Sequence, residues 1–323
     1  MLVCVDTGTT NTRVWLASAG EVIARADALV GVRDTARDGH NGKLVEALRE
    51  LIQQVLEQAG FARPAGCSVL AAGMITSALG LEEVPHVQAP AGPAELAAAV
   101  RRLHRPDISE LPILLVPGVR SGAMPCSLQT VSESDIMRGE ETLALGLVAE
   151  GMLRSPGRIL NLGSHWKLID VDAQGRVAGS HTSLSGELIH ATQTQTILAS
   201  SVAQGRPESL DRDWLEAGIG EQQRQGLARA LFEVRLLEQS RHGTPEQRMA
   251  FLVGAYLGHE LDAWQRAGRW KDASEVLVAG HAVLADACSH LLRQRHVTAS
   301  VIQASQVERG FLAGLHAVER LVA

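Results

Sequence analysis

The alternation of apolar and polar residues near the amino terminus predicts short strands joined by a tight turn. Apolar runs at Leu2 to Val5 and Thr12 to Ala17 flank a segment of Gly, Thr and Asn, which are typical hairpin-turn residues. A third strand is expected at Glu21 to Ala26. Gly42 to Gln58 then carries apolar residues at helical spacing, which predicts an amphipathic helix. The chain therefore opens as a sheet followed by a covering helix.

The same plan occurs twice along the chain. The first half continues with a strand at Cys67 to Ala71, a helix at about Pro93 to Leu103 and a strand at Ile113 to Val116. The second half repeats strands and helices in a similar order. Its expected strands are Arg158 to Leu162, Trp166 to Asp170, Arg176 to His181, Glu275 to Val278 and Val297 to Val301, and its expected helices begin at Glu140 or cover Gly186 to Val202, Glu221 to Leu237, Pro245 to Arg266 and the carboxyl terminus.

This duplication predicts an α/β fold of two actin-like, ribonuclease H-like lobes with a nucleotide cleft between them. A length of 323 residues also favours two lobes over a single core. We expect residues 1–134 to form an amino-terminal lobe that carries the first glycine turn. Residues 135–323 should form a second lobe, with the terminal helix packing back on the first.

Composition narrows the choice of partners and compartment. A net charge of −6 argues against a nucleic-acid surface, although a local basic pocket for a small anion is compatible with it. The four cysteines lie far apart, which predicts neither a disulfide framework nor a zinc site. The sequence shows no signal peptide or membrane-spanning run, so we expect a cytoplasmic protein without a membrane partner.

The segment after the first strand has the composition of a phosphate-binding turn. Small residues at Gly8, Thr9, Thr10 and Asn11 allow backbone N–H groups to approach an anion. Asp6, at the strand end, is a candidate ligand for Mg²⁺, which keeps part of its water shell while bridging phosphates. An ordinary polar hairpin remains the alternative interpretation. The segment is not a Walker P-loop, because no GK[ST] follows.

A second glycine turn lies between strands in the other half. Gly163, Ser164 and His165 follow a predicted strand, and Lys167 stands just beyond them. Glycine turns between strands are common, so this turn alone is weak evidence for a site. It becomes a stronger candidate because it forms a pair with the first turn. Lys167 is a candidate phosphate contact, but a solvated lysine is the more ordinary interpretation.

A charged cluster from Ser134 to Thr142 lies between the two turns, at the start of a predicted helix. A carboxylate at Asp135 or Glu140 is suited to accept a proton from a substrate hydroxyl, and Arg138 to bind an anionic group. Acidic residues in a first helical turn are also common simply because they complement the helix dipole. The position between the halves favours the functional interpretation.

Two further strand ends run into glycine turns. Ala279-Gly280 ends one of them, a shape suited to a nucleotide base or ribose. The other carries Gly73, Met74, Thr76 and Ser77, which are candidates to contact substrate oxygens.

Taken together, these motifs resemble the 2-dehydro-3-deoxygalactonokinase family of the actin-like kinase superfamily. The most specific segment is Asp135 to Thr142, which is similar to the family's DVMRGEET. The other matching segments are Asp6 to Trp15, Ala72 to Met74, Pro117-Gly118, Gly163 to Lys167, Ser185 to Leu188, Leu231 to Arg235 and Ala279-Gly280.

The resemblance implies transfer of the γ-phosphoryl group of MgATP to the 6-hydroxyl of 2-dehydro-3-deoxy-D-galactonate, a step of galactonate catabolism. It also implies that residues 1–134 mainly bind the sugar acid and supply the first phosphate loop, and that residues 135–323 mainly bind ATP. By placement in related sugar kinases, Glu140 is the first choice for the base and Asp135 the second. Asp6 would organise Mg²⁺, and Thr9, Thr10, Gly163 and Ser164 would hold phosphates. Arg138 is the expected contact for an anionic group, and Arg13 competes with it.

Departures from the family pattern keep two alternatives open. After Ala72 to Met74 the family often continues to a Gly-Trp pair, whereas Gly80 is followed here by Leu81. A kinase of another keto-deoxy or aldonic acid is therefore the main alternative. An actin-like ATPase regulator without kinase activity is the second, and the carboxylates around Arg138 disfavour it. A homodimer is left open.

Overall fold

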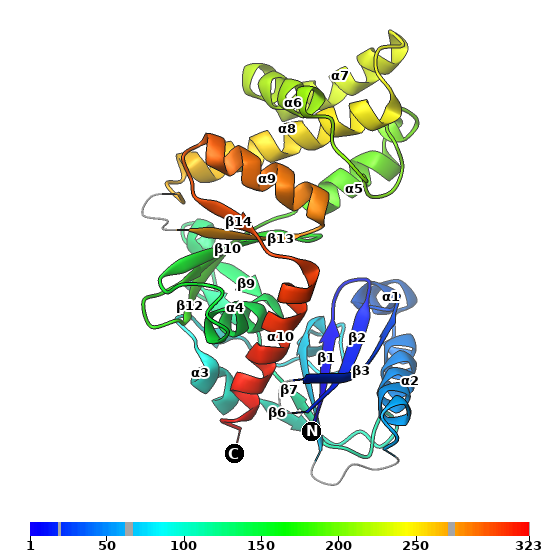
Figure 1. Ribbon diagram of the computed structural model, residues 1–323, viewed down its shortest axis with the longest axis vertical. Coiled ribbons are helices and arrows are strands. Elements are labelled where there is room, and N and C mark those ends of the chain that lie inside the picture. The colour runs from blue at the N-terminus through cyan, green and yellow to red at the C-terminus, as the bar shows by residue number, and fades with distance from the viewer. Residues whose placement is uncertain (19–20, 62–66, 271–274, 323) are drawn as a thin grey trace. The chain divides into compact units, whose positions relative to one another are not determined.

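The computed structural model describes residues 1–18, 21–61, 67–270 and 275–322 (Figure 1). The chain forms two compact units that interleave along the sequence. The first unit contains Met1–Pro156, Ile169–Ser180 and Ser305–Ala323, and the second contains Gly157–Leu168 and His181–Ala304. A single boundary after residue 134 does not coincide with these units, because the segment that follows it packs with the first one. The assignment of sugar acid and ATP to separate lobes stays a prediction.

The first unit is built on a six-stranded sheet in the order β3-β2-β1-β4-β7-β6. The strand β1 pairs antiparallel with β2 and parallel with β4, and β4 pairs parallel with β7. Parallel pairing places the carboxyl ends of β1 and β4 at one edge, with Thr7 opposite Gly73. The strands are β1 (Leu2–Thr7), β2 (Thr12–Ser18), β3 (Glu21–Ala28), β4 (Ser68–Gly73), β6 (Arg101–Leu103) and β7 (Ile113–Leu115).

Helices cover this sheet because their apolar faces match its core. The helices α1 (Val32–Asp38) and α2 (Gly42–Gln58) follow β3, and α2 packs across β2 and β3 (Figure 1). The helix predicted over Pro93 to Leu103 is wrong in its last residues. The helix α3 is Pro93–Ala98, and the chain then enters β6, whose pairing with β7 replaces further helical hydrogen bonds.

A small second sheet leads into the helix α4 (Glu140–Ala149). Its strands are β5 (Val87–Gln88), β8 (Val119–Ser121) and β9 (Asp135–Met137), in the order β5-β8-β9. Asp135 begins β9 and lies outside the helix, which starts at Glu140 as predicted. The terminal helix α10 (Ala304–Glu319) lies against α4 and brings Phe311 within 6.0 Å of the Trp15 ring, centroid to centroid.

A five-stranded sheet has the order β12-β11-β10-β13-β14, which repeats the order of the first five strands in the amino-terminal sheet and confirms the duplicated plan. Its strands β10, β13 and β14 run parallel. The strands are β10 (Gly157–Leu162), β11 (Trp166–Val171), β12 (Val177–Ser183), β13 (Val276–Gly280) and β14 (Ala299–Val301).

The helix predicted over Glu221 to Leu237 is wrong, because Gly226, with φ of 84°, separates two helices.

The second unit adds helices to this strand framework. The helices α6, α7 and α8 pack on one another, and α9 packs on β13 and β14 (Figure 1). Their core is aliphatic with buried Trp166, Tyr256 and Trp264. The helices are α5 (Ser185–Gln195), α6 (Arg212–Gln225), α7 (Leu227–Gln239), α8 (Pro245–Arg266) and α9 (Ala282–Gln294).

Candidate active site

The turn between β1 and β2 is held in place by the residues that start α1. Within it the Gly8 N–H donates to the Asn11 carbonyl at 2.8 Å. The Val32 and Arg33 N–H groups donate to the carbonyls of Gly8 and Thr9 at 3.2 and 2.9 Å. These bonds engage carbonyl oxygens of the turn inside the protein. The turn that was expected to bind phosphate is therefore a fixed backbone structure.

Asp6 lies on β1 just before this turn. Its side chain is 25% exposed, and its Oδ2 lies 3.3 Å from Nη1 of Arg13 on the neighbouring strand. Burial is the main cause that raises the pKa of Asp6, Arg13 lowers it, and the negative charge of Glu140 raises it, so that the resulting pKa is about 6. The carboxylate is still mostly ionised at neutral pH, as a cation ligand must be.

Two glycines bring β4 and the start of α4 against Asp6. Gly73 has φ of 90°, and a side chain there would begin 2.5 Å from the Thr7 carbonyl and 3.2 Å from Asp6 Oδ1. Gly139 has φ of 103°, and a side chain there would begin 3.1 Å from the Gly73 Cα. Only glycine combines such positive φ angles with this lack of space. The chain thus places the β1 end, the β4 end and the α4 start together.

Glu140 is the first residue of α4 and is half-buried. Its Oε2 accepts the Arg138 N–H at 3.2 Å, and its charge acts on Asp6 through space. Asp135 faces a different part of the first unit, where its Oδ2 accepts the Ser180 hydroxyl at 2.7 Å and its Oδ1 accepts the Ile136 N–H at 2.9 Å. Of the two candidate bases, Glu140 lies in the electrostatic neighbourhood of Asp6.

The Arg138 side chain ties the start of α4 to the segment after β4. Its Nη1 donates to the Thr76 hydroxyl at 2.8 Å and to the Val84 carbonyl at 3.0 Å, and Nη2 lies 3.4 Å from Nδ1 of His86. Thr76 belongs to the 3₁₀ turn Met74–Thr76, and its hydroxyl donates to the Gly73 carbonyl. The Ser77 hydroxyl donates to Met74. The expected substrate wall is therefore hydrogen-bonded to Arg138.

Glu141 is a functional candidate that sequence reasoning missed. Its side chain is fully buried, and both of its oxygens accept the Gly139 N–H, at 2.8 and 2.9 Å. Burial, and secondarily the charge of Glu140, raise the pKa of Glu141 to about 7, although the bond from Gly139 lowers it. The repeated acid in Gly139-Glu140-Glu141 was a visible signal, but helix-dipole complementarity explained it equally well.

The raised pKa of Glu141 predicts a pH dependence of folding stability. An unfolded Glu titrates near 4.5, so between that value and about 7 the folded state binds the extra proton and stability falls as pH rises. We expect the free energy of unfolding to drop by on the order of 3 kcal/mol across this window because of Glu141. Urea unfolding at pH 5 to 8, compared with Glu141→Gln, measures it. An equal slope in both proteins would contradict the assignment.

In the second unit, the turn after β10 is packed against the start of α5. A side chain at Gly186 would begin 2.2 Å from the Gly163 carbonyl, and the Glu187 N–H donates to the Ser164 carbonyl at 2.8 Å. His165 Nε2 lies 3.8 Å from Glu187 Oε2. The turn predicted from Gly163 to His165 thus meets a helix start, which sequence reasoning did not assign to the site.

The end of β13 lies beside this turn. Gly280 pairs with Leu162, and Ala279 pairs with Asn161, in the parallel register of β10 and β13. Gly280 has φ of 142°, and a side chain there would begin 2.8 Å from the Leu162 carbonyl. Lys167, by contrast, is buried on β11 and its Nζ donates to the Thr182 hydroxyl at 2.7 Å. The second unit therefore gathers two of the predicted turns at one sheet edge.

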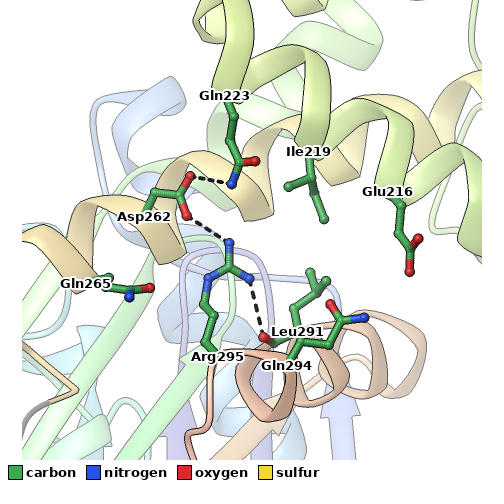
Figure 2. Close-up of a pocket in the computed structure, with 8 residues that line it drawn as sticks. All are labelled: Glu216, Ile219, Gln223, Asp262, Gln265, Leu291, Gln294 and Arg295. Atoms are coloured by element: carbon green, nitrogen blue, oxygen red, sulfur yellow. Dashed lines mark hydrogen bonds and ion pairs between the residues drawn. The ribbon is translucent and has the colours of Figure 1, made fainter.

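A surface pocket of about 450 Å³ lies elsewhere in the second unit, between α6, α8 and the last turn of α9 (Figure 2). There Asp262 accepts from Arg295 at 2.8 Å and from Gln223 at 3.0 Å, so its carboxylate links all three segments. The pocket is lined by Glu216, Ile219, Gln223, Asp262, Gln265, Leu291, Gln294 and Arg295. None of these residues was predicted from the sequence to belong to a site.

Among residues 1–18, 21–61, 67–270 and 275–322, no group of three or more His, Cys, Asp or Glu side chains is arranged to hold a metal ion. In the same part of the chain, every helix is too short or too polar to cross a membrane.

The fold matches solved structures over the whole chain. A crystal structure of a Sinorhizobium meliloti protein, described as a candidate 2-dehydro-3-deoxygalactonokinase, has a TM-score of 0.78 and 22% identity, covering 100% of this chain and 97% of that one. The activator of 2-hydroxyisocaproyl-CoA dehydratase from Clostridium difficile has a TM-score of 0.51 and 12% identity, covering 99% and 95%. These likenesses show the actin-like ATPase and sugar-kinase fold.

Two relatives are similar in sequence. A Rhizobium meliloti (strain 1021) protein named "Probable 2-dehydro-3-deoxygalactonokinase" is 29% identical over 202 residues, which are 62% of this chain and 58% of the relative. The chain thus matches little more than half the length of that relative. The 2-dehydro-3-deoxygalactonokinase of Escherichia coli (strain K12) is 25% identical over 264 residues, covering 80% and 78%.

The family comparison covers nearly the whole chain and includes the candidate residues of both units. The model of the 2-keto-3-deoxy-galactonokinase family matches residues 6–318. On that match, this chain belongs to the 2-keto-3-deoxy-galactonokinase family, as its motifs predicted.

Proposed function

We propose that this protein transfers the γ-phosphoryl group of MgATP to the 6-hydroxyl of 2-keto-3-deoxy-galactonate. The observation that carries the proposal is the family match over residues 6–318. The convergence of Asp6, Gly73 and Glu140 in the first unit supports it, because a kinase needs a cation ligand next to the acceptor base. The cytoplasmic location stays a prediction, and a homodimer stays open.

Glu140 is the proposed general base for the acceptor hydroxyl, with Asp135 as the second choice. Phosphoryl transfer depends mainly on positioning and charge stabilisation, so the base must orient the hydroxyl more than it must be strong. Arg138 and Arg13 are the proposed partners of anionic groups. Gly73, Met74, Thr76 and Ser77 form the proposed sugar-side wall, which the Arg138 hydrogen bonds hold in place.

Asp6 is the proposed contact for Mg²⁺. A single carboxylate fits this ion, because Mg²⁺ is commonly held by one or two carboxylates, substrate phosphates and water. The ion would neutralise the charge on the transferred group. Gly8, Thr9, Thr10 and Asn11 are the proposed contacts of the first turn with phosphate.

In the second unit, Gly163, Ser164 and His165 are the proposed phosphate contacts. Ala279 and Gly280 are proposed to lie against the base or ribose, at the carboxyl end of β13 where α/β sheets commonly hold nucleotides. The starts of α5 and α9 lie at the same sheet edge, which suits an anionic ligand.

A panel of substrates tests the proposed function. ADP release is measured with 2-keto-3-deoxy-galactonate, related keto-deoxy acids and aldonic acids, each with MgATP. We expect turnover that depends on the keto-deoxy acid, with product phosphorylated at the 6-hydroxyl. Preference for another acid would support the alternative sugar-acid kinase, for which Leu81 in place of the family's tryptophan is a reason. Hydrolysis that ignores every acid would contradict the kinase and favour the ATPase regulator.

A further inference from the structure

The two residues proposed to act on the acceptor side, Arg138 and Glu140, flank a single glycine. Gly139 has a left-handed backbone conformation with φ of 103°. Its position also sets how α4 approaches the end of β4. A Cβ atom added at Gly139 would lie only 3.1 Å from the Gly73 Cα. Whatever fixes Gly139 therefore fixes the direction of both neighbouring side chains.

The Glu141 carboxylate is the group that fixes it. Both oxygens lie within 2.9 Å of the Gly139 nitrogen, and Oε1 also accepts the Thr142 hydroxyl at 3.2 Å. The side chain is fully buried, so these bonds are made away from bulk water. A buried carboxylate that accepts backbone and hydroxyl hydrogens holds its partners more firmly than an exposed one, because water does not compete.

We propose that Glu141 is a positioning residue for phosphoryl transfer, which holds the Arg138-Gly139-Glu140 turn so that Glu140 reaches the acceptor hydroxyl. This inference rests on the proposed kinase function. Glu141 has no direct contact with substrate in the proposal. It acts through the Gly139 N–H, which the isolated helix α4 would leave without an intrahelical acceptor.

The proposal separates two properties of Glu141, its hydrogen-bond acceptor and its charge. A glutamine has the same shape and can accept the Gly139 N–H through its amide oxygen, while its NH₂ group donates to the Thr142 hydroxyl. A methionine has similar length but offers no comparable acceptor. If positioning is the role, glutamine should preserve the turn and methionine should release it.

The experiment measures kcat, and KM for MgATP and for the keto-deoxy acid, in wild type, Glu141→Gln and Glu141→Met. We expect Glu141→Met to lose about 100-fold in kcat, the effect of misplacing a reacting group by roughly 1 Å. Its KM for MgATP should stay within about twofold of wild type, and Glu141→Gln should keep kcat within about threefold. A merely structural role would lower the amount of folded enzyme without this division between kcat and KM.

The outcomes distinguish this inference from the function it rests on. Wild type without acid-dependent turnover would remove the proposed function itself. An active wild type with normal kcat in folded Glu141→Met would overturn the positioning role alone, as would an equal loss in Glu141→Gln, which would assign the effect to charge. If Glu141→Met does not fold, Glu141→Asp replaces it. Because the aspartate side chain is shorter, its carboxylate should displace the Gly139 N–H and the turn around it, and lower kcat about tenfold. An unchanged kcat overturns the proposal.

Discussion

Glu140→Gln is expected to lower kcat by about 10²- to 10⁴-fold, the range over which a positioned general base contributes. The amide keeps the length of the side chain but cannot take the proton of the acceptor hydroxyl. Because the change is not at the phosphate turns, ATP binding should persist. Single-turnover rates and nucleotide titration measure the two properties separately.

The matched control is Asp135→Asn, which makes the same chemical change at the second candidate base. In the structure Asp135 accepts the Ser180 hydroxyl and lies on β9, so we expect this variant to keep much more of its kcat. If Asp135→Asn loses the larger share of kcat while Glu140→Gln stays near normal, the assignment reverses. A loss of ATP binding in Glu140→Gln would instead place Glu140 on the nucleotide side.

Gly146→Ala is expected to destabilise the first unit by about 3 kcal/mol, at the upper end of the range for overpacked cores. A methyl group at Gly146 would lie 1.6 Å from the Gly310 carbonyl, so α4 and α10 would have to separate. The reciprocal contact at Gly314, where the added carbon would lie 1.9 Å from the Thr142 carbonyl, leaves no easy adjustment. Urea unfolding followed by circular dichroism measures the loss.

The control is the same substitution at a helical glycine with room. At Gly220 in α6 the nearest group is the flexible end of Arg224 at 3.6 Å, so Gly220→Ala should stabilise the protein by about 1 kcal/mol through helix propensity. Changes of opposite sign in the free energy of unfolding at the two positions would show that crowding, and not the loss of glycine itself, decides the outcome. A stable Gly146→Ala would mean that α4 and α10 are not packed this closely.

The parts of the fold that repeated patterns specify were predictable. Gly42–Gln58 and Pro245–Arg266 form the helices expected at these positions, because a helical pattern of this length outweighs local alternatives. Short segments were not predictable from such patterns. Arg101–Leu103 continued a helical pattern but became a strand through its pairing with β7, a contact that no local propensity encodes.

The candidate site also contains residues that the sequence indicated and distinctions that only the structure made. Asp6, Gly73, Glu140 and Gly163 were found because strand ends, glycine turns and carboxylates have recognisable chemistry in the sequence. The sequence ranked Glu140 above Asp135 only through its placement in related sugar kinases, since both residues stand in one charged segment. The structure places Asp135 on a strand and Glu140 at a helix start, where it acts on Asp6.

Thus the sequence by itself determined the duplicated α/β plan, the glycine turns and the family, because these depend on residue type and order along the chain. Tertiary structure decided that Gly139 meets Gly73, that Arg138 bonds to Thr76, and that Glu141 is buried beneath the turn. The physical reason is that burial and nonlocal contacts change what a residue does. A carboxylate that would complement a helix dipole on the surface becomes, when buried, a fixed acceptor with a pKa of about 7.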